Sequence, residues 1–193
     1  MIMLQPLGGC AVGKSLLFET LARNPFSWME RTDAQSHVFT FCPAIRLVMV
    51  GSYLGKRSRG IDGGAGQPGP RTKATALAAL DVAMDKAAKI SFDVAWEGQI
   101  IQTRQYHHTE LLPRGLHPLY VFLDVPYPIV VERILTLRGG RLTSVQSHGA
   151  DKRRLAAWLE AEGASVLRLD GTAPIGYSAK QVRATLWTMR CAT

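Results

Sequence analysis

Eight consecutive residues near the start of the chain have the types and spacing that bind phosphate. Residues 8–15 read GGCAVGKS, which fits the pattern G-x-x-x-x-G-K-[ST]. Gly8 and Gly13 let the backbone curl with its N–H groups pointing inward, so that they form a nest for phosphate oxygens. Lys14 then reaches the β- and γ-phosphates of a nucleotide, and the hydroxyl of Ser15 can ligate Mg²⁺. The residues expected to contact the nucleotide are Gly8, Gly9, Cys10, Ala11, Val12, Gly13, Lys14, Ser15 and Leu16.

A phosphate loop needs a second acidic group to hold the metal, usually at the end of a neighbouring strand. Two carboxylates follow strand-like segments: Glu97 in FDVAWEG and Asp124 in VFLDVP. A glycine and then polar residues follow Glu97, as expected beside a substrate cleft, whereas Asp124 stands close to a proline and is expected to fix the next turn. We therefore expect Glu97, together with Ser15, to hold the metal or position water; a structural turn carboxylate is the alternative.

The segment 55–70, GKRSRGIDGGAGQPGP, is a long loop rich in glycine and basic residues. Long loops inside compact domains are usually functional lids or disordered segments. Lys56, Arg57 and Arg59 can track the phosphates of a nucleic acid backbone, and Asp62 can accept the proton of an attacking hydroxyl. Asp33 also belongs to the expected substrate side and competes with Asp62 as general base. A flexible, solvated loop is the competing interpretation of the segment.

Three arginines surround the end of the helix expected over residues 129–137. Arg133, Arg138 and Arg141 lie near a Gly-Gly pair, which suits a small lid, expected near residues 133–150, that closes over a transferring phosphate. Arginines stabilise the charge that develops in phosphoryl transfer. We expect Arg138 to serve catalysis and nucleotide binding, whereas Arg133 can instead pair with a helical neighbour such as Glu132.

The segment 99–112 adds further basic residues. Arg104 is assigned to the nucleic acid side. His107 and His108 are adjacent, so on a helix they point in different directions and are not expected to ligate one metal together; we place them at the surface or in a substrate channel. Tryptophans in apolar periodic segments are expected to be core residues: Trp96, Trp158 and Trp187.

Alternating strand-like and helix-like segments must position these groups. Residues 1–4 have the pattern of a strand that ends at Pro6, and a helix that begins at Ser15 directs the positive end of its dipole at bound phosphates. Further strands are expected over 45–53, 92–96, 119–125 and 165–169, with 36–41 as a shorter candidate, and further helices over 72–89, 99–112, 129–137, 151–162 and 178–189. In the helix over 72–89, the expected apolar face is Leu77, Leu80, Met84 and Ala88. This order predicts one α/β domain over residues 1–193, with three layers, α/β/α, around a five-stranded, mostly parallel sheet.

The composition narrows the classes of protein. No apolar run approaches the roughly 20 residues needed to span a bilayer, and no basic region precedes the first apolar residues as in a signal peptide. The 3 cysteines have no C-x-x-C spacing, so we expect neither a disulfide framework nor a zinc site, and a reducing, cytoplasmic location. The net charge of +8 favours a polyanionic partner, with generic solubility as the alternative.

The motifs together resemble the P-loop kinases of the nucleotide-kinase type. The resemblance extends over GGCAVGKS, the strand ending in WEG, the LYVFLDVP strand and the ERILTLRGGR lid. Within that group, GSYLGKRSRGIDGG followed by WEGQIIQT resembles the phage kinases that act on DNA carrying 5-hydroxymethyluracil, although Gly60-Ile61-Asp62 departs from the expected G-T-D. The resemblance implies a P-loop NTPase fold. It also implies transfer of the γ-phosphate of ATP, with Mg²⁺, to the hydroxymethyl group of a modified pyrimidine in DNA, in the host cytoplasm if the chain is phage-encoded.

Three functions follow as hypotheses. The first is a DNA-base kinase in which Lys14 holds phosphates, Asp62 activates the hydroxyl and Arg138 steadies charge. The second is a kinase for free deoxynucleosides or their monophosphates, against which the high net charge argues because a small ligand needs no extended cationic surface. The third is a nucleotide-dependent DNA-binding protein whose phosphate loop binds without transfer. The sequence leaves the acceptor base, the donor nucleotide, the general base and the oligomeric state open.

Overall fold

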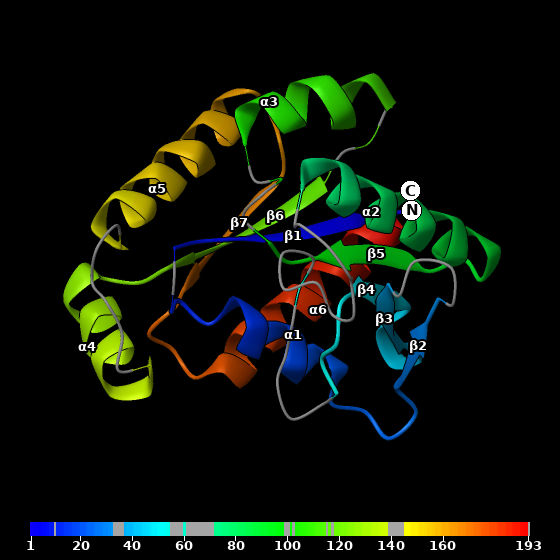
Figure 1. Ribbon diagram of the computed structural model, residues 1–193, viewed down its shortest axis with the longest axis horizontal. Helices are drawn as coiled ribbons and strands as arrows, with labels where there is room; N and C mark the ends of the chain where they lie inside the picture. The colour runs from blue at the N-terminus through cyan, green and yellow to red at the C-terminus, as the bar shows by residue number, and fades with distance from the viewer. Residues whose placement is uncertain are drawn as a thin grey trace.

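The described part of the chain folds around one seven-stranded sheet, seen in the computed structural model of Figure 1. The strand order is β2–β3–β4–β5–β1–β6–β7, in which β4, β5, β1, β6 and β7 are parallel, whereas β3 runs antiparallel to β4 and to β2. The strand bounds are β1 Met3–Leu7, β2 Trp28–Arg31, β3 Val38–Cys42, β4 Leu47–Val50, β5 Asp93–Trp96, β6 Pro118–Asp124 and β7 Val166–Asp170.

The structure describes residues 1–9, 11–32, 37–54, 60, 72–98, 101, 103–114, 116, 118–138 and 145–192, with the side chains at 137–138 and 145–148 outside the description. The expected α/β class is confirmed, but the prediction of five strands is wrong. Five strands do form the parallel part, and the antiparallel pair β2–β3 extends it at one edge. All four residues of β2 are exposed, so this edge strand lacks the alternation of apolar and polar residues that marks a half-buried strand.

Pro6 lies inside β1 and not at its end. In this parallel strand the backbone groups of Ile2 face β5, since its carbonyl accepts from the N–H of Val94. Alternate residues face the same neighbour, so Pro6 also faces β5. The pairing of β1 with β5 covers only Met3 and Leu4, whereas the pairing with β6 continues to Leu7. The missing N–H of Pro6 therefore interrupts no ladder bond, and the strand can continue to the loop that begins at Gly8.

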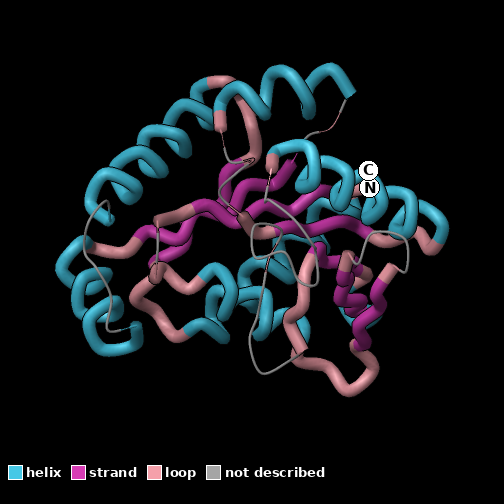
Figure 2. The backbone as a smooth tube through the Cα atoms, in the orientation of Figure 1, coloured by secondary structure: helices cyan, strands magenta, loops and turns pink. Residues whose placement is uncertain are grey.

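Helices cover both faces of the sheet, as Figure 2 shows. The cluster of buried residues on one face draws on α1, α4 and α6, and the cluster on the other face draws on α2 and α3, with α5 over β6 and β7. The helix bounds are α1 Lys14–Ala22, α2 Lys73–Lys89, α3 Arg104–Tyr106, α4 Tyr127–Arg138, α5 Val145–Ala161 and α6 Ile175–Cys191. None of the described helices is both long enough and apolar enough to cross a membrane.

The helix expected over residues 72–89 is confirmed as α2, but its buried face differs from the expected one. Leu80 is buried, whereas Leu77 and Met84 are half-buried and Ala88 is exposed. The other buried positions are alanines: Ala76, Ala79, Ala83 and Ala87. Small side chains let α2 lie close to β4 and β5, and large apolar residues therefore do not mark this face.

Two further predictions are wrong in part. The helix expected over 99–112 begins only at Arg104 in the described residues and changes type along its length: α3 is followed directly by a π-helical turn over His107–Leu111 and a 3₁₀ turn over Leu112–Arg114. Trp96 is buried and Trp158 is half-buried, but Trp187 is 69% exposed. The buried stripe of α6 is Ser178, Ala179, Val182 and Leu186, which places Trp187 just outside the packed face.

Candidate active site

The loop between β1 and α1 has the backbone geometry that its glycines predict. Gly8 has φ 143°, Ala11 has φ 56° and Gly13 has φ 101°, which are values that residues with a side chain rarely adopt. A Cβ atom on Gly8 would also lie 2.7 Å from Cγ2 of Val12 and 3.2 Å from the carbonyl oxygen of Leu123. Only glycine therefore fits at position 8, where the chain leaves the strand and begins to curl. Cys10 lies outside the described residues.

Lys14 is folded over this loop. Its side chain is buried, and Nζ donates to the carbonyl oxygens of Gly8 at 2.9 Å and Gly9 at 2.6 Å. Lys14 is also the first residue of α1, and the preceding Gly13 has no side chain with which to cap the helix. A buried ammonium group and the start of a helix thus meet at the turn, and both favour an anion there.

Ser15 and Glu97, the two residues expected to hold a metal, are in contact. Oγ of Ser15 donates to Oε1 of Glu97 at 2.7 Å, although the residues are 82 positions apart. The fold brings them together because β1 and β5 are neighbouring parallel strands, and Glu97 directly follows the last residue of β5. A hydroxyl and a carboxylate oxygen are the hard ligands that Mg²⁺ prefers, so this pair fits the ion.

The glycine-rich segment reaches this pair through Gly60. A Cβ atom on Gly60 would lie 2.3 Å from the backbone oxygen of Glu97 and 3.1 Å from its Cβ. Any side chain at position 60 would therefore displace the backbone that carries the carboxylate. Lys56, Arg57, Arg59 and Asp62, which we predicted from this segment, lie outside the described residues.

The described residues on either side of Asp33, Thr32 and His37, lie near the end of β4. Thr32 donates its backbone N–H to the carbonyl oxygen of His37 at 2.8 Å, and the paired strands place Val38 beside the end of β4. The carboxyl ends of β4 and β5 lie at one edge of the sheet, as in any parallel pair. Residues 32 and 37 therefore lie near the same ends of the strands as Glu97. Asp33 itself lies outside the described residues.

The helices expected to carry a lid, α4 and α5, lie beside the loop between β1 and α1. A pocket of about 180 Å³ is lined by Gly9 and Val12 of the loop, the end of β6 and residues of α4 and α5. Arg133 donates to the carbonyl oxygen of Gly171 at 3.0 Å, a contact that differs from the pairing considered with Glu132. The side chain of Arg138, and all of Arg141, are outside the described residues.

Asp124 has a structural partner, as we expected of a residue that fixes a turn. Its Oδ1 accepts from Nε of Arg153 at 3.0 Å, and its backbone oxygen accepts from the N–H of Gly171 at 2.7 Å. The sequence had not singled out Arg153 or Gly171, because nothing in the local pattern of α5 or of the turn after β7 indicates these contacts.

The basic segment near Arg104 divides into a buried and an exposed part. His107 is buried and its Nδ1 lies 2.7 Å from the hydroxyl of Tyr120, so the expectation that it lies at the surface is wrong. Burial raises the pKa of Tyr120, which keeps its hydroxyl protonated. His108 and Arg104 are exposed, and both lie against the ring of Trp158.

The sequence is similar to a curated phage protein. No protein-family model matches the sequence. The chain is 28% identical over 123 residues to 5-hmdU DNA kinase 1 of Salmonella phage ViI, a match that covers 59% of this chain and 53% of the phage protein. The chain thus spans about half the length of the curated relative that it matches. The similarity to phage kinases of this kind, which the motifs indicated, is confirmed.

Proposed function

We propose that this protein is a kinase that transfers the γ-phosphate of ATP to the hydroxymethyl group of 5-hydroxymethyluracil in DNA. The observation that carries the proposal is the 2.7 Å contact between Ser15 of the phosphate loop and Glu97 after the adjacent strand. The name of the phage relative, a 5-hmdU DNA kinase, supports the choice of acceptor.

The donor side is assigned to the loop and its flanking residues. Inward N–H groups of residues 8–15 and the ammonium group of Lys14 bind the phosphates, for which Lys14 leaves the carbonyl oxygens of Gly8 and Gly9 that it contacts here. Arg138 steadies the charge on the transferring group. Ser15 and Glu97 would hold Mg²⁺, which neutralises charge on the phosphate oxygens when bound.

The acceptor side is assigned to the segments that meet Glu97. The hydroxymethyl oxygen forms a bond to the γ-phosphorus while the bond from that phosphorus to the β–γ bridging oxygen breaks, and ADP leaves. The hydroxyl proton passes to a carboxylate, for which we choose Asp62, two residues beyond Gly60, with Asp33 as the alternative.

The polymer partner is supported by charge. A net charge of +8 suits a nucleic acid backbone better than a single small anion, and Lys56, Arg57, Arg59 and Arg104 are the cations assigned to it. A base that enters an active site of this kind has to leave the stack. We assign the protein to the cytoplasm, and to that of a bacterial host if it is phage-encoded.

The test supplies γ-labelled ATP with three acceptors: DNA that carries 5-hydroxymethyluracil, the same DNA with thymine, and the free hydroxymethylated nucleotide. We expect label in the first DNA alone. Label in the free nucleotide and none in DNA would replace the proposal with a deoxynucleoside or deoxynucleoside monophosphate kinase. ATP-dependent DNA binding without transfer to any acceptor would indicate a binding protein.

A further inference from the structure

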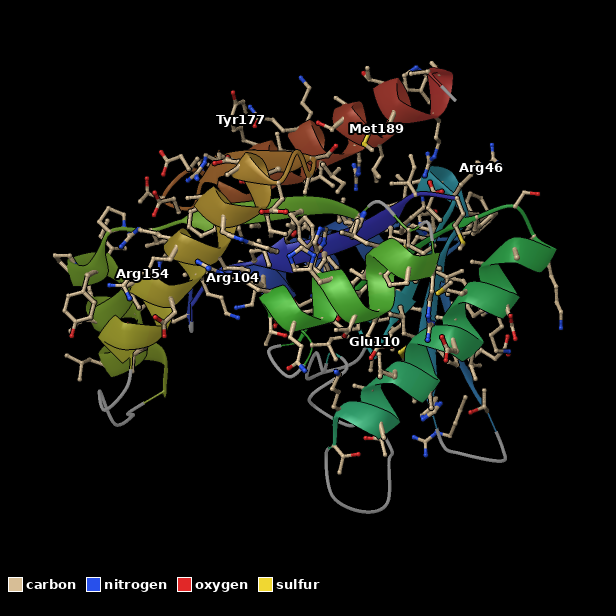
Figure 3. The ribbon with its side chains drawn as sticks, turned by 90° about the horizontal axis from the view of Figure 1, so that it is seen from above. Arg46, Arg104, Glu110, Arg154, Tyr177 and Met189 are labelled. Atoms are coloured by element: carbon tan, nitrogen blue, oxygen red, sulfur yellow. The ribbon has the colours of Figure 1, made fainter. Side chains whose placement is uncertain are left out.

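Arg104 is held against an aromatic ring at the junction of α3 and α5. Its guanidinium carbon lies 5.2 Å from the centroid of the Trp158 ring, and the ring of His108 lies 4.9 Å from the same ring at 73°. Arg104 and His108 are exposed, whereas Trp158 is half-buried. Figure 3 shows Arg104 at the start of α3, beside α5.

Other arginines on this side of the molecule pair with carboxylates. The pairs are Arg114 with Asp81, Arg153 with Asp124, Arg154 with Asp151 and Arg168 with Glu160. Among the residues that the structure describes, Arg104 has no carboxylate within ion-pair distance and donates no hydrogen bond. A guanidinium group that rests on a ring keeps its N–H donors in the plane available for another acceptor.

The position of Arg104 relates it to the phosphate loop. Trp158 packs against the buried cluster that contains Leu7, Tyr120 and Phe122, and Leu7 is the residue before Gly8. Arg104 itself follows Glu97 by seven positions and begins the helix that leaves this end of β5. Arg104 therefore begins the described helical segment that follows Glu97 in the chain, and it rests on an indole that packs against β1 and β6.

We propose that Arg104 contacts a backbone phosphate of the DNA substrate and that Trp158 is a positioning residue for it. This inference rests on the proposed function, which supplies DNA as the partner. Stacking on the indole restricts the long arginine side chain before DNA binds, so that less conformational entropy is lost on binding. The competing explanation is that Arg104 only shields the ring of Trp158 from water.

The test measures binding of a labelled oligonucleotide that carries 5-hydroxymethyluracil, between about 50 and 200 mM salt. Arg104→Ala should weaken binding about tenfold and reduce the slope of log affinity against log salt by about one. Arg23→Ala is the matched control, because Arg23 is an exposed arginine directly after α1, a helix that packs on the opposite face of the sheet, and its loss removes the same charge. Kinetically, Arg104→Ala should raise KM for DNA and leave kcat and KM for ATP unchanged.

The variants of Trp158 separate positioning from packing. Trp158→Phe keeps a ring under Arg104 and should bind DNA nearly as the wild type does, whereas Trp158→Ala should approach Arg104→Ala in affinity. Thermal denaturation of each variant verifies that it is folded, and Trp187→Ala, on the exposed face of α6, controls for loss of an indole. If Trp158→Ala does not fold, the DNA affinities of Arg104→Ala and Trp158→Phe decide between the inference and its competing explanation.

The outcomes distinguish this inference from the proposed function. Equal affinity and an equal salt slope for the variants at positions 104 and 23 would overturn the inference, while transfer to DNA by the wild type would leave the function intact. A wild-type protein that neither binds nor labels DNA would overturn both. A lowered slope for Arg104→Ala alone supports the inference.

Discussion

Two carboxylates flank β5, one at each end, and their partners differ in kind. At the beginning of the strand, Asp93 is buried and accepts from the backbone N–H of Ile2 at 2.6 Å and from Nε of Arg190 at 2.7 Å. At the other end, Glu97 accepts from the hydroxyl of Ser15 at 2.7 Å. Asp93 joins β1, β5 and α6, whereas Glu97 faces the phosphate loop.

The difference shows how one strand can serve stability and chemistry separately. The charge of Asp93 is balanced by Arg190 of α6, so loss of the Asp93 carboxylate would remove an ion pair that joins this strand to the helix. Glu97 contacts a residue type that holds metal in phosphate loops. Variants at the two ends should therefore separate the free energy of unfolding from the rate of phosphate transfer.

Among the variants of candidate active-site residues, Lys14→Met is expected to have the largest effect on the rate of phosphate transfer. Loss of the ammonium group removes its stabilisation of the transferring phosphate, and we expect kcat/KM to fall by about 10³-fold. The measurement is the initial rate of label transfer, with Lys180→Met, a change at an exposed position on α6, as control. A Lys14→Met protein within a few-fold of the wild-type rate would show that the loop does not act on phosphate.

At the beginning of β5, Asp93→Asn is expected to have the largest effect on the free energy of unfolding. The amide removes the negative charge that faces Arg190, and removal of one member of a buried pair destabilises by about 3–5 kcal/mol. The Arg190 side chain is 20% exposed, so we expect about 2–3 kcal/mol, or about 5–10 °C in Tm. Calorimetry measures this loss, and the transfer rate per folded molecule should stay at the wild-type value. An unchanged Tm would contradict a structural role.

Glu97→Gln should give the opposite result. The amide cannot replace the carboxylate as a ligand. We therefore expect kcat to fall about 10²-fold, and we expect the variant to need more Mg²⁺ to reach its half-maximal rate. The Tm should change little, because the hydroxyl of Ser15 can still donate to the side-chain oxygen. Titration of Mg²⁺ against rate is the measurement, with Glu162→Gln, an exposed position beyond α5, as control. An identical Mg²⁺ response in Glu97→Gln and wild type would exclude Glu97 from the metal site.

A smaller effect is expected from Gly60→Ala. The new Cβ would meet the backbone oxygen of Glu97 at 2.3 Å, so either the glycine-rich segment or Glu97 must move, and we expect the rate to fall about tenfold. Gly176→Ala is the matched control, because nothing lies within 4 Å of a Cβ atom at that position. Equal rates for the two variants would show that the approach of Gly60 to Glu97 does not matter for transfer.

The sequence predicted the neighbours of Glu97 at the end of β5 better than it predicted the surrounding fold. The phosphate-loop pattern and the strand before Glu97 predicted Ser15 and Glu97 as members of one site, and the two side chains are in contact, because each signal is local and parallel strands end together. The edge strand β2 was missed because its exposed residues carry no apolar alternation.

Contacts between residues that are far apart in the sequence could not be predicted from the sequence either. The approach of Gly60 to Glu97 and the pairing of Arg153 with Asp124 depend on how distant segments pack. The position of Arg104 over Trp158 has the same origin, since the two residues belong to α3 and α5. The outward position of Trp187 followed from small residues that cover the buried face of α6, and counting apolar residues does not reveal such a face.

The smallest expected effect is on the reactivity of the buried thiol of Cys42. Burial raises the pKa of Cys42 to about 11, so the thiol stays protonated and unreactive near neutral pH. At about pH 8, an alkylating reagent should modify the exposed Cys191 and leave Cys42 intact, as read by peptide mass spectrometry. Asp93→Asn should make Cys42 react faster, since it populates open states, and Glu97→Gln should not. Equal reactivity of Cys42 and Cys191 in the wild type would contradict this.

The most direct measurement compares label transfer from γ-labelled ATP to hydroxymethyluracil DNA by the wild type, Asp93→Asn and Glu97→Gln at one temperature where all three are folded. We expect the wild type and Asp93→Asn to label the DNA at equal rates and Glu97→Gln to label it about 10²-fold more slowly. Absence of label in DNA from the wild type, or equal rates for Glu97→Gln and the wild type, would contradict the assignment of this edge of the sheet to phosphate transfer.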